Sequence, residues 1–246
     1  MVLVTGGASC GKSAYAERLC MALGSKRVYL AAMKPFGEEG AARVRKHRAQ
    51  RSGKGFQTVE CYDGLDSIVV DERFSGATVL LEDLGNVVAN WQFGRDGSCS
   101  DPLFPPNGEP GDFGDGRVQA QAGAQWLMGQ LDSIQQACAH MVIVGNEVGC
   151  DGVTYDPQTV TYQQVLGALA GCVAEACDIV VECVAGIPRV LKAKDAHALP
   201  IDSDTLLDSV HVALPNGLPA DTVPNDAAAC NDTTAWHSAY RDARGR

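Results

Sequence analysis

The first 23 residues constrain the fold more tightly than any other part of the chain. An apolar run at 1–5 is typical of a buried strand, and a helical pattern follows at 14–23. Between them lies a G-x-x-x-x-G-K-S pattern made of Gly6, Gly7, Ala8, Ser9, Cys10, Gly11, Lys12 and Ser13. Strand, glycine loop and helix in this order indicate a phosphate-binding loop rather than a chance glycine turn.

The chemistry of this loop predicts that the chain binds a nucleoside triphosphate. The backbone N–H groups of a glycine-rich turn point at an anion, and the helix N-terminus adds partial positive charge. We expect Lys12 to neutralise phosphate oxygens during the reaction and the Ser13 hydroxyl to hold Mg²⁺.

Apolar runs alternate with helical patterns along the chain, which predicts an α/β fold of the P-loop NTPase (RecA-like) type, with a mainly parallel sheet flanked by helices. The expected strands are 1–5, 27–32, 57–61, 77–81, 141–144 and 179–184, and the expected helices after the first are 38–51, 85–91, 127–138 and 162–173. We predict a catalytic domain at 1–199 with a loop insertion at 94–116, followed by a poorly ordered tail at 200–246.

Composition narrows the classes of partner. A net charge of −10 argues against general nucleic-acid or membrane-surface binding, and no apolar run is long enough to span a bilayer. The ten cysteines lack the paired spacing of a zinc site, so we interpret them as reduced thiols in a cytoplasmic protein.

A second candidate site residue is Glu82, which follows the apolar run Val79-Leu80-Leu81 and is itself followed by Asp83. A carboxylate at the end of such a strand can hold Mg²⁺ beside Ser13. The alternative is a surface acid that caps the following helix.

A third candidate site is the basic segment 43–51, in which five cations surround His47. On a helix Arg43, His47 and Arg51 share one face, where guanidinium groups suit a triphosphate. Neighbouring cations disfavour imidazolium, so the ring would stay neutral and nucleophilic. A solvated basic face with a passive histidine explains the spacing equally well.

Several short motifs give the chain a resemblance to a known family. They are V-T-G-G-A-x-x-G-K-S at 4–13, Y-L-A-A at 29–32, A-A-R-V-x-x-H-R at 41–48, T-V-E at 58–60, L-L-E at 80–82, N-E-V-G at 146–149 and G-I-P-x-x-L-K at 186–192. In this order they resemble the bifunctional adenosylcobinamide kinase/adenosylcobinamide-phosphate guanylyltransferases, over roughly residues 1 to 192.

The resemblance implies a reaction with a covalent intermediate. His47 would attack the α-phosphorus of GTP, and the guanylylated histidine would pass GMP to adenosylcobinamide phosphate, giving adenosylcobinamide-GDP. A kinase step would phosphorylate adenosylcobinamide with ATP or GTP, with Mg²⁺ as cofactor, and the family forms a trimer. The implied nucleotide contacts are the loop Gly6 to Ser13, Leu30, Ala31, Ala32, Arg48, Ala49, Gln50, Arg51, Glu60 and Glu82.

The chain departs from the family pattern at three places. Ser9 and Cys10 stand where the family usually has Arg and Ser. The late-helix pattern R-D-x-x-G-x-x-N-Q becomes the segment 163–171, which keeps only its glycine, and this bears on corrinoid binding and the kinase step. The loop at 94–116 and the tail after Lys192 are additions.

Three other functions remain open from the sequence. A different P-loop small-molecule kinase would transfer phosphate without a covalent histidine. A regulatory GTPase would carry N-K-x-D where Asn146-Glu147-Val148-Gly149 stands, and the lysine and aspartate are missing. A diverged nucleotide-binding protein would bind without turnover.

Overall fold

A computed structural model describes residues 1–35, 37–62, 65, 68, 72–93, 116–149 and 151–194, all of which belong to one compact unit. The expected tail at 200–246 lies outside the described residues, as does the expected insertion at 94–116 apart from Gly116, where a helix begins. The boundaries of the catalytic domain at 1–199 therefore stay a prediction.

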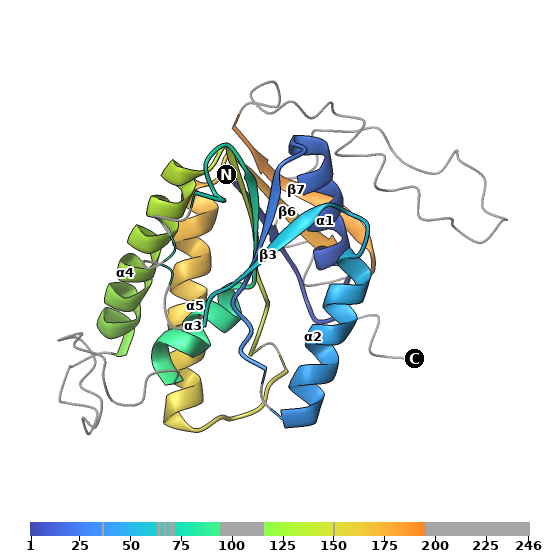
Figure 1. Cartoon of the computed structure of the whole chain (residues 1–246). Helices are drawn as coiled ribbons and strands as arrows, with labels where there is room; N and C mark the ends of the chain where they lie inside the picture. Colours follow the sequence, from blue (N-terminus) through green and yellow to red (C-terminus); the bar gives the residue numbers. More distant parts are fainter. Residues whose placement is uncertain are drawn as a thin grey trace, which may run out of the picture. The chain divides into compact units, whose positions relative to one another are not determined.

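In the described part of the chain seven strands form one sheet, in the order β3-β2-β4-β5-β1-β6-β7 (Figure 1). Neighbouring strands are parallel except β6 and β7, which are antiparallel. The strands are β1 (Val2–Thr5), β2 (Arg27–Ala31), β3 (Phe56–Glu60), β4 (Thr78–Glu82), β5 (His140–Val144), β6 (Ile179–Val184) and β7 (Ile187–Ala193). The predicted mainly parallel α/β sheet is confirmed.

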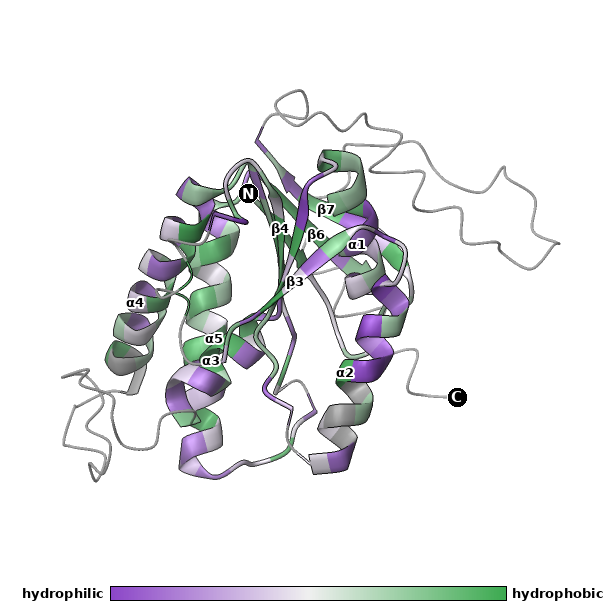
Figure 2. Ribbon diagram, viewed as in Figure 1, coloured by the Kyte–Doolittle hydropathy of each residue, from purple (hydrophilic) through white to green (hydrophobic). Residues whose placement is uncertain are grey.

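Helices cover both faces of the sheet. They are α1 (Lys12–Leu23), α2 (Gly37–Arg51), α3 (Leu84–Phe93), α4 (Gly116–Ala137) and α5 (Pro157–Ala176). Figure 1 shows α3, α4 and α5 on one side of the sheet and α1 and α2 on the other. In Figure 2 the central strands are largely green, whereas α2 is mainly purple and pale, so α2 brings little apolar surface to the core.

Alternate residues of the central strands enter two separate cores. In β1, Leu3 packs into the core beneath α3, α4 and α5, whereas Val2 and Val4 pack beneath α1. Leu81 and Leu80 divide in the same way in β4. Because both faces of each central strand are buried, these strands read as continuous apolar runs in the sequence.

Strand register places the candidate site residues at one edge of the sheet. Glu60 and Glu82 both pair with Ala31 of β2, and Glu82 also pairs with Val144 of β5. These residues form one row at the carboxyl ends of parallel strands, which is the edge where ligands bind in open α/β sheets.

The strand β7 is not predicted by the sequence. Ile187 and Leu191 are exposed, and Pro188 interrupts the run, so the segment lacks the pattern of a buried strand. Proline is tolerated here because β7 is an edge strand that pairs only with β6 in the described sheet.

Candidate nucleotide site

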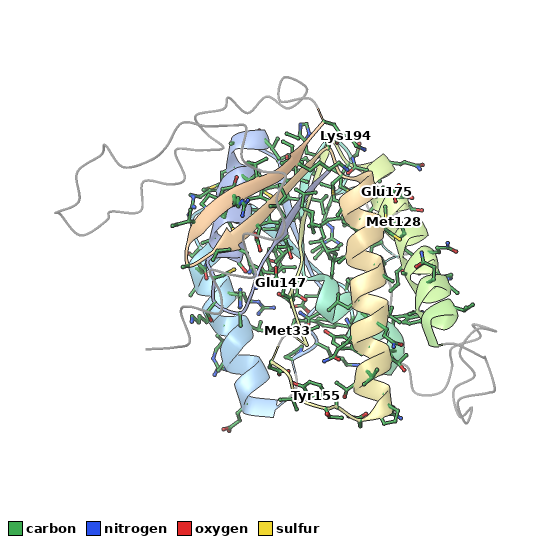
Figure 3. All side chains as sticks on the ribbon, turned by 180° about the vertical axis from the view of Figure 1, so that it is seen from behind. Met33, Met128, Glu147, Tyr155, Glu175 and Lys194 are labelled. Carbon is green, nitrogen blue, oxygen red and sulfur yellow. The ribbon has the colours of Figure 1, made fainter. Side chains whose placement is uncertain are left out.

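A cavity of about 840 Å³ lies at the carboxyl edge of the sheet. Its walls come from the phosphate loop, the ends of β2 and β4, the loop after β5, and α2. It is lined by Ala8, Ser9, Cys10, Gly11, Lys12, Ser13, Ala14, Tyr29, Ala31, Met33, Ala42, Val44, Lys46, His47, Arg48, Gln50, Arg51, Thr58, Glu60, Tyr62, Glu82, Asp83, Asn86, Asn146, Glu147 and Val148. Figure 3 shows Met33 and Glu147 between α2 and α5.

The phosphate loop is tightly folded against its neighbours. Gly6 has a φ of 146°, and a Cβ added there would lie 2.4 Å from the Cys183 carbonyl oxygen and 2.7 Å from the Cys10 sulfur, so only glycine fits. The backbone N–H of Gly186 donates to the Cys10 carbonyl at 2.9 Å. Lys12 Nζ bends back and donates to the Gly7 carbonyl at 3.0 Å, at the mouth of the loop.

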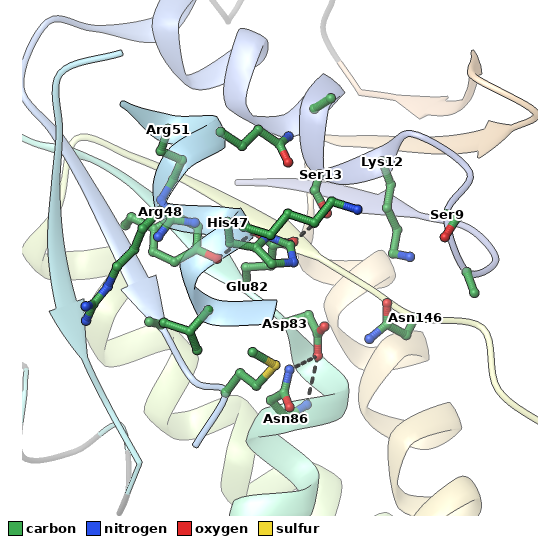
Figure 4. A pocket seen from close by; sticks show the side chains of 18 of the residues that line it. Ser9, Lys12, Ser13, His47, Arg48, Arg51, Glu82, Asp83, Asn86 and Asn146 are labelled. Carbon is green, nitrogen blue, oxygen red and sulfur yellow. Dashed lines mark hydrogen bonds and ion pairs between the residues drawn. The ribbon is translucent and has the colours of Figure 1, made fainter. Parts of the chain in front are cut away.

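Glu82 connects the loop to the sheet. It is only 7% exposed and accepts hydrogen bonds from the Ser13 hydroxyl and, at 2.8 Å, from the Tyr29 hydroxyl. Burial and the Glu82 carboxylate raise the pKa of Tyr29 far above its usual value, so Tyr29 stays a hydrogen-bond donor. Nδ1 of His47 lies 3.9 Å from Glu82 Oε1 (Figure 4).

The opposite wall of the cavity is the C-terminal half of α2. Arg51 is 7% exposed and stacks on the Tyr29 ring, with its guanidinium carbon 3.3 Å from the ring centroid. Arg48 is exposed and forms an ion pair with Glu60 of β3. His47 Nδ1 and one Arg51 guanidinium nitrogen are buried without a hydrogen-bond partner among the described residues. Two unsatisfied polar atoms at one cavity indicate an anionic or polar ligand.

A partly buried ion pair holds the end of α2 against α1. Lys54, in the turn after α2, pairs with Glu17 of α1, whose side chain is fully buried. The Lys54 carbonyl accepts a hydrogen bond from Arg27 Nη1 at 2.7 Å. This anchor fixes where α2 ends, and therefore where His47 and Arg51 meet the cavity.

Asp83 lies beside Glu82 at the N-terminus of α3. Its Oδ1 accepts the backbone N–H of Asn86 at 2.8 Å and the Asn86 side-chain amide at 2.9 Å. Asn146 also donates to this carboxylate. Burial raises the pKa of Asp83 above its usual value, against the lowering effect of these hydrogen bonds. The helix cap considered for Glu82 is thus made by Asp83 instead.

Most of the residues predicted from the sequence meet at this cavity. It is lined by Ala8, Ser9, Cys10, Gly11, Lys12, Ser13, Ala31, His47, Arg48, Gln50, Arg51, Glu60 and Glu82. It is not lined by Gly6, Gly7, Leu30, Ala32 or Ala49. Leu30 and Ala32 are buried in the core beneath α3 to α5, because strand alternation turns them away from the face that bears Tyr29 and Ala31. The Arg43 side chain lies outside the described part of the chain.

Several lining residues were not predicted as ligand contacts. Tyr29 reads as a core aromatic inside an apolar strand, and only the position of Glu82 reveals its role. Asn86 sits one turn into α3, and Asn146 and Glu147 follow β5. For Asn146 and Glu147, only their position in the sequence could have indicated a ligand contact, because they come directly after a strand end at the ligand-binding edge.

The oxygen donors at the loop suit a magnesium ion that is shared with a nucleotide. Ser13 and Glu82 present a hydroxyl and a carboxylate, the hard ligands that Mg²⁺ prefers. Within the described residues no group of three or more His, Cys, Asp or Glu side chains could hold a metal ion alone. The remaining ligands would be phosphate oxygens and water, which is the usual way in which Mg²⁺ binds.

No helix in the described ranges combines the length and apolar character needed to cross a membrane.

Comparisons with known proteins agree on one family. Residues 2–191 match the family described as cobinamide kinase / cobinamide phosphate guanyltransferase. The bifunctional adenosylcobalamin biosynthesis protein CobU of Escherichia coli K12 is 31% identical over 192 residues, which is 78% of this chain and 99% of that protein. The Salmonella typhimurium CobU is 30% identical over the same shares of both chains. CobP of Pseudomonas aeruginosa is 28% identical and is covered to 97%.

Among solved structures, an ATPase of a bacterial type III secretion system overlaps with a TM-score of 0.41 at 10% identity, over 83% of this chain and 59% of that chain. This likeness is too weak to carry any argument about function.

Proposed function

Because the chain belongs to the cobinamide kinase / cobinamide phosphate guanyltransferase family, we propose that it phosphorylates adenosylcobinamide and then transfers GMP from GTP to the product, with His47 as the covalent carrier. The observation that supports the covalent route is the position of His47. Its Nδ1 lies 3.9 Å from Glu82, which is hydrogen-bonded to Ser13 of the phosphate loop, and it has no hydrogen-bond partner among the described residues.

The first half of the guanylyl transfer needs a nucleophile and a stabilised leaving group. An imidazole nitrogen of His47 attacks the α-phosphorus of GTP, an N–P bond forms, and the bond to the β-phosphate oxygen breaks. Lys12 and Arg51 line the cavity and neutralise the charge that develops on pyrophosphate. The Glu82 carboxylate near Nδ1 stabilises the positive charge that the ring gains.

The second half transfers GMP to a different acceptor. A phosphate oxygen of adenosylcobinamide phosphate attacks the same phosphorus, the N–P bond breaks, and His47 is regenerated together with adenosylcobinamide-GDP. Carrying GMP on the enzyme allows pyrophosphate to leave before the bulky corrinoid binds. Mg²⁺, held by Ser13 and Glu82 with phosphate oxygens, would add charge neutralisation to both halves.

The kinase step would use the same phosphate loop, with ATP or GTP as donor. In the altered late helix, Gln163 and Gln164 do not line this cavity, so the change there does not remove a side chain from its wall. Gln163 instead packs against Gly149, where an added Cβ would lie 3.0 Å from its Nε2. Its position supports the loop after β5 rather than a nucleotide contact.

Two further properties belong to the proposal through the family resemblance alone. We expect a homotrimer and a cytoplasmic location. Sedimentation equilibrium of the full chain would separate a trimer from a monomer.

The experiment that tests the covalent route is intact-protein mass spectrometry after incubation with GTP and Mg²⁺. We expect a GMP-sized, acid-labile adduct that is labelled from α-labelled but not from γ-labelled GTP. His47→Ala should abolish the adduct. His140→Ala is the matched control and should keep it, because His140 begins β5 at the opposite edge of the sheet.

The alternatives are another P-loop small-molecule kinase without a covalent histidine and a diverged nucleotide-binding protein. Phosphate transfer without an adduct would favour the first, and GTP binding with neither an adduct nor phosphate transfer would favour the second.

A further inference from the structure

Asp83 is a carboxylate in the nucleotide cavity that the proposed guanylyl transfer does not use. It follows Glu82 directly, so it lies next to the residue that is hydrogen-bonded to the phosphate loop. Two hydrogen bonds from Asn86, at 2.8 and 2.9 Å, fix its Oδ1, and Asn146 donates to it from the loop after β5. In Figure 4 Asp83 lies between Glu82 and Asn146.

Capping α3 does not by itself account for an aspartate at this position. A cap needs one oxygen acceptor, which serine or asparagine supplies as well as aspartate does. A carboxylate that is taken out of water carries a desolvation cost that these neutral caps avoid. The ionisable group is therefore retained at a cost to stability, in a cavity where its charge can act on a ligand.

The surroundings of Asp83 are polar and closely packed. A Cβ added at Gly85 would lie 3.2 Å from Asp83 Oδ1, 3.1 Å from Asn146 Nδ2 and 2.9 Å from the Tyr162 hydroxyl, so these groups pack directly against the glycine. Asp83, Asn86 and Asn146 also line the nucleotide cavity, so this part of its wall is polar. Such a wall suits a polar group of an acceptor substrate better than an apolar ring.

The position of Asp83 near the expected site of the γ-phosphate favours a role in the kinase step. Lys12 and Ser13 mark the end of the loop where the terminal phosphates bind, and the Lys12 charge acts on Asp83. An acceptor hydroxyl has to approach the γ-phosphorus in line, from the side opposite the leaving oxygen. Asp83 and Asn146 lie next to each other in the cavity (Figure 4), and the segment that carries Asn146 is joined to the phosphate loop by the Glu147 N–H, which donates to the Gly6 carbonyl at 3.3 Å.

We infer that Asp83 is a catalytic residue of the kinase step, which accepts a hydrogen bond from the aminopropanol hydroxyl of adenosylcobinamide and directs its oxygen at the γ-phosphorus. The new O–P bond forms while the bond from phosphorus to the β,γ-bridging oxygen breaks, and nucleoside diphosphate leaves. The hydroxyl proton passes along the hydrogen bond to Asp83 and then to solvent. This inference rests on the proposed function.

The same carboxylate does not suit the second acceptor. In guanylyl transfer the attacking group is an anionic phosphate, which Asp83 would repel rather than orient. Asp83 is therefore expected to serve the kinase step alone, and its replacement should separate the two activities of the cavity.

The test compares Asp83→Asn and Asp83→Ser with the native full chain, because both replacements keep a helix cap. Phosphate transfer from γ-labelled ATP to adenosylcobinamide should fall about 10²-fold in kcat, with little change in KM. Formation of the GMP adduct from GTP should be retained, and the thermal unfolding temperature should not fall. Asp156→Asn is the matched control, because Asp156 caps α5 outside the cavity lining, and it should keep full kinase activity.

Two results would overturn the inference. Kinase activity within about threefold of native in both variants would show that the carboxylate is not needed. An equal loss of kinase activity and adduct formation would place Asp83 in nucleotide binding. The adduct assay on the native chain tests the proposed guanylyl transfer, whereas the kinase assay of the Asp83 variants tests this inference. Failure of the proposed function and failure of the inference therefore give different results.

Discussion

The wall of the cavity built by the phosphate loop and β4 is continuous with the core, whereas the wall built by α2 is a polar helix held by charged contacts. Lys12 and Glu82 are nearly buried, and Glu82 is fixed by hydrogen bonds from two other elements. On α2, Lys46 and Arg48 are exposed, and the helix is positioned through Arg51 stacking and the Lys54–Glu17 pair. In the proposed reaction this difference separates two tasks: the core wall would hold the phosphates, and α2 would present His47 to them.

Replacing one lysine on each wall should show the functional difference between the two walls most clearly. Lys12→Ala removes the ammonium group at the phosphate loop, and both activities should fall about 10³-fold. Lys46→Ala removes a solvated charge from α2 and should change either activity only slightly. Steady-state assays of both steps make the measurement. Similar losses in the two variants would show that the walls are equivalent.

Glu82→Gln tests the proposed metal-holding role of the core wall. The amide keeps the size of the side chain but removes the negative charge beside Ser13. The Mg²⁺ concentration for half-maximal adduct formation should rise about 10–100-fold. Glu147→Gln, another carboxylate at the cavity, is the control and should leave the Mg²⁺ dependence unchanged. A Glu82→Gln enzyme with native Mg²⁺ dependence would remove Glu82 from the proposed site.

Two arginines of α2 allow a finer comparison within one wall. Arg51→Met keeps the apolar stem but loses the contact with the Tyr29 ring, so the free energy of unfolding should fall by about 1 kcal/mol. Arg48→Met breaks an exposed ion pair with Glu60 and should cost at most about 0.5 kcal/mol. Denaturant unfolding of both variants measures the difference. A larger loss of unfolding free energy in Arg48→Met than in Arg51→Met would mean that the exposed ion pair, not the stacked arginine, attaches α2.

The smallest effect is a pH dependence of stability in protein free of metal and nucleotide. Burial raises the pKa of Asp83, so the folded state binds this proton more tightly than the unfolded state does. Its contribution to stability is therefore present below the ordinary pKa of about 4 and is lost as the pH rises through the raised value. Asp83→Asn should unfold at a higher temperature than the native chain at pH 7, and the gap should close at pH 3. A gap that persists at pH 3 would contradict this origin.

The core wall could be predicted because its function is encoded locally. The phosphate loop needs glycines and a lysine at fixed spacing, and buried strands read as apolar runs that end at Thr5 and Glu82. The contribution of Tyr29 could not be predicted, since its hydroxyl meets Glu82 only through the pairing of β2 with β4. The side chain of Leu30 faces the core rather than the cavity, and this orientation follows from the two-residue period of the strand.

The α2 wall was harder to predict for the opposite reason. Its charges indicate a basic helix, but a basic helix is equally consistent with a solvated face. The meeting of His47 with Glu82 depends on where α2 ends, and the partly buried Lys54–Glu17 pair that fixes this end joins residues far apart in the sequence. The edge strand β7 was missed because its exposed apolar residues and Pro188 do not have the pattern of a core strand.

The most direct test of His47 as the carrier is a chase experiment. Guanylylated protein is freed of GTP and mixed with adenosylcobinamide phosphate, and protein mass and corrinoid products are followed together. The account predicts that the adduct disappears while an equal amount of adenosylcobinamide-GDP forms without added GTP. An adduct that persists in the presence of acceptor, while the enzyme still turns over with GTP, would contradict it.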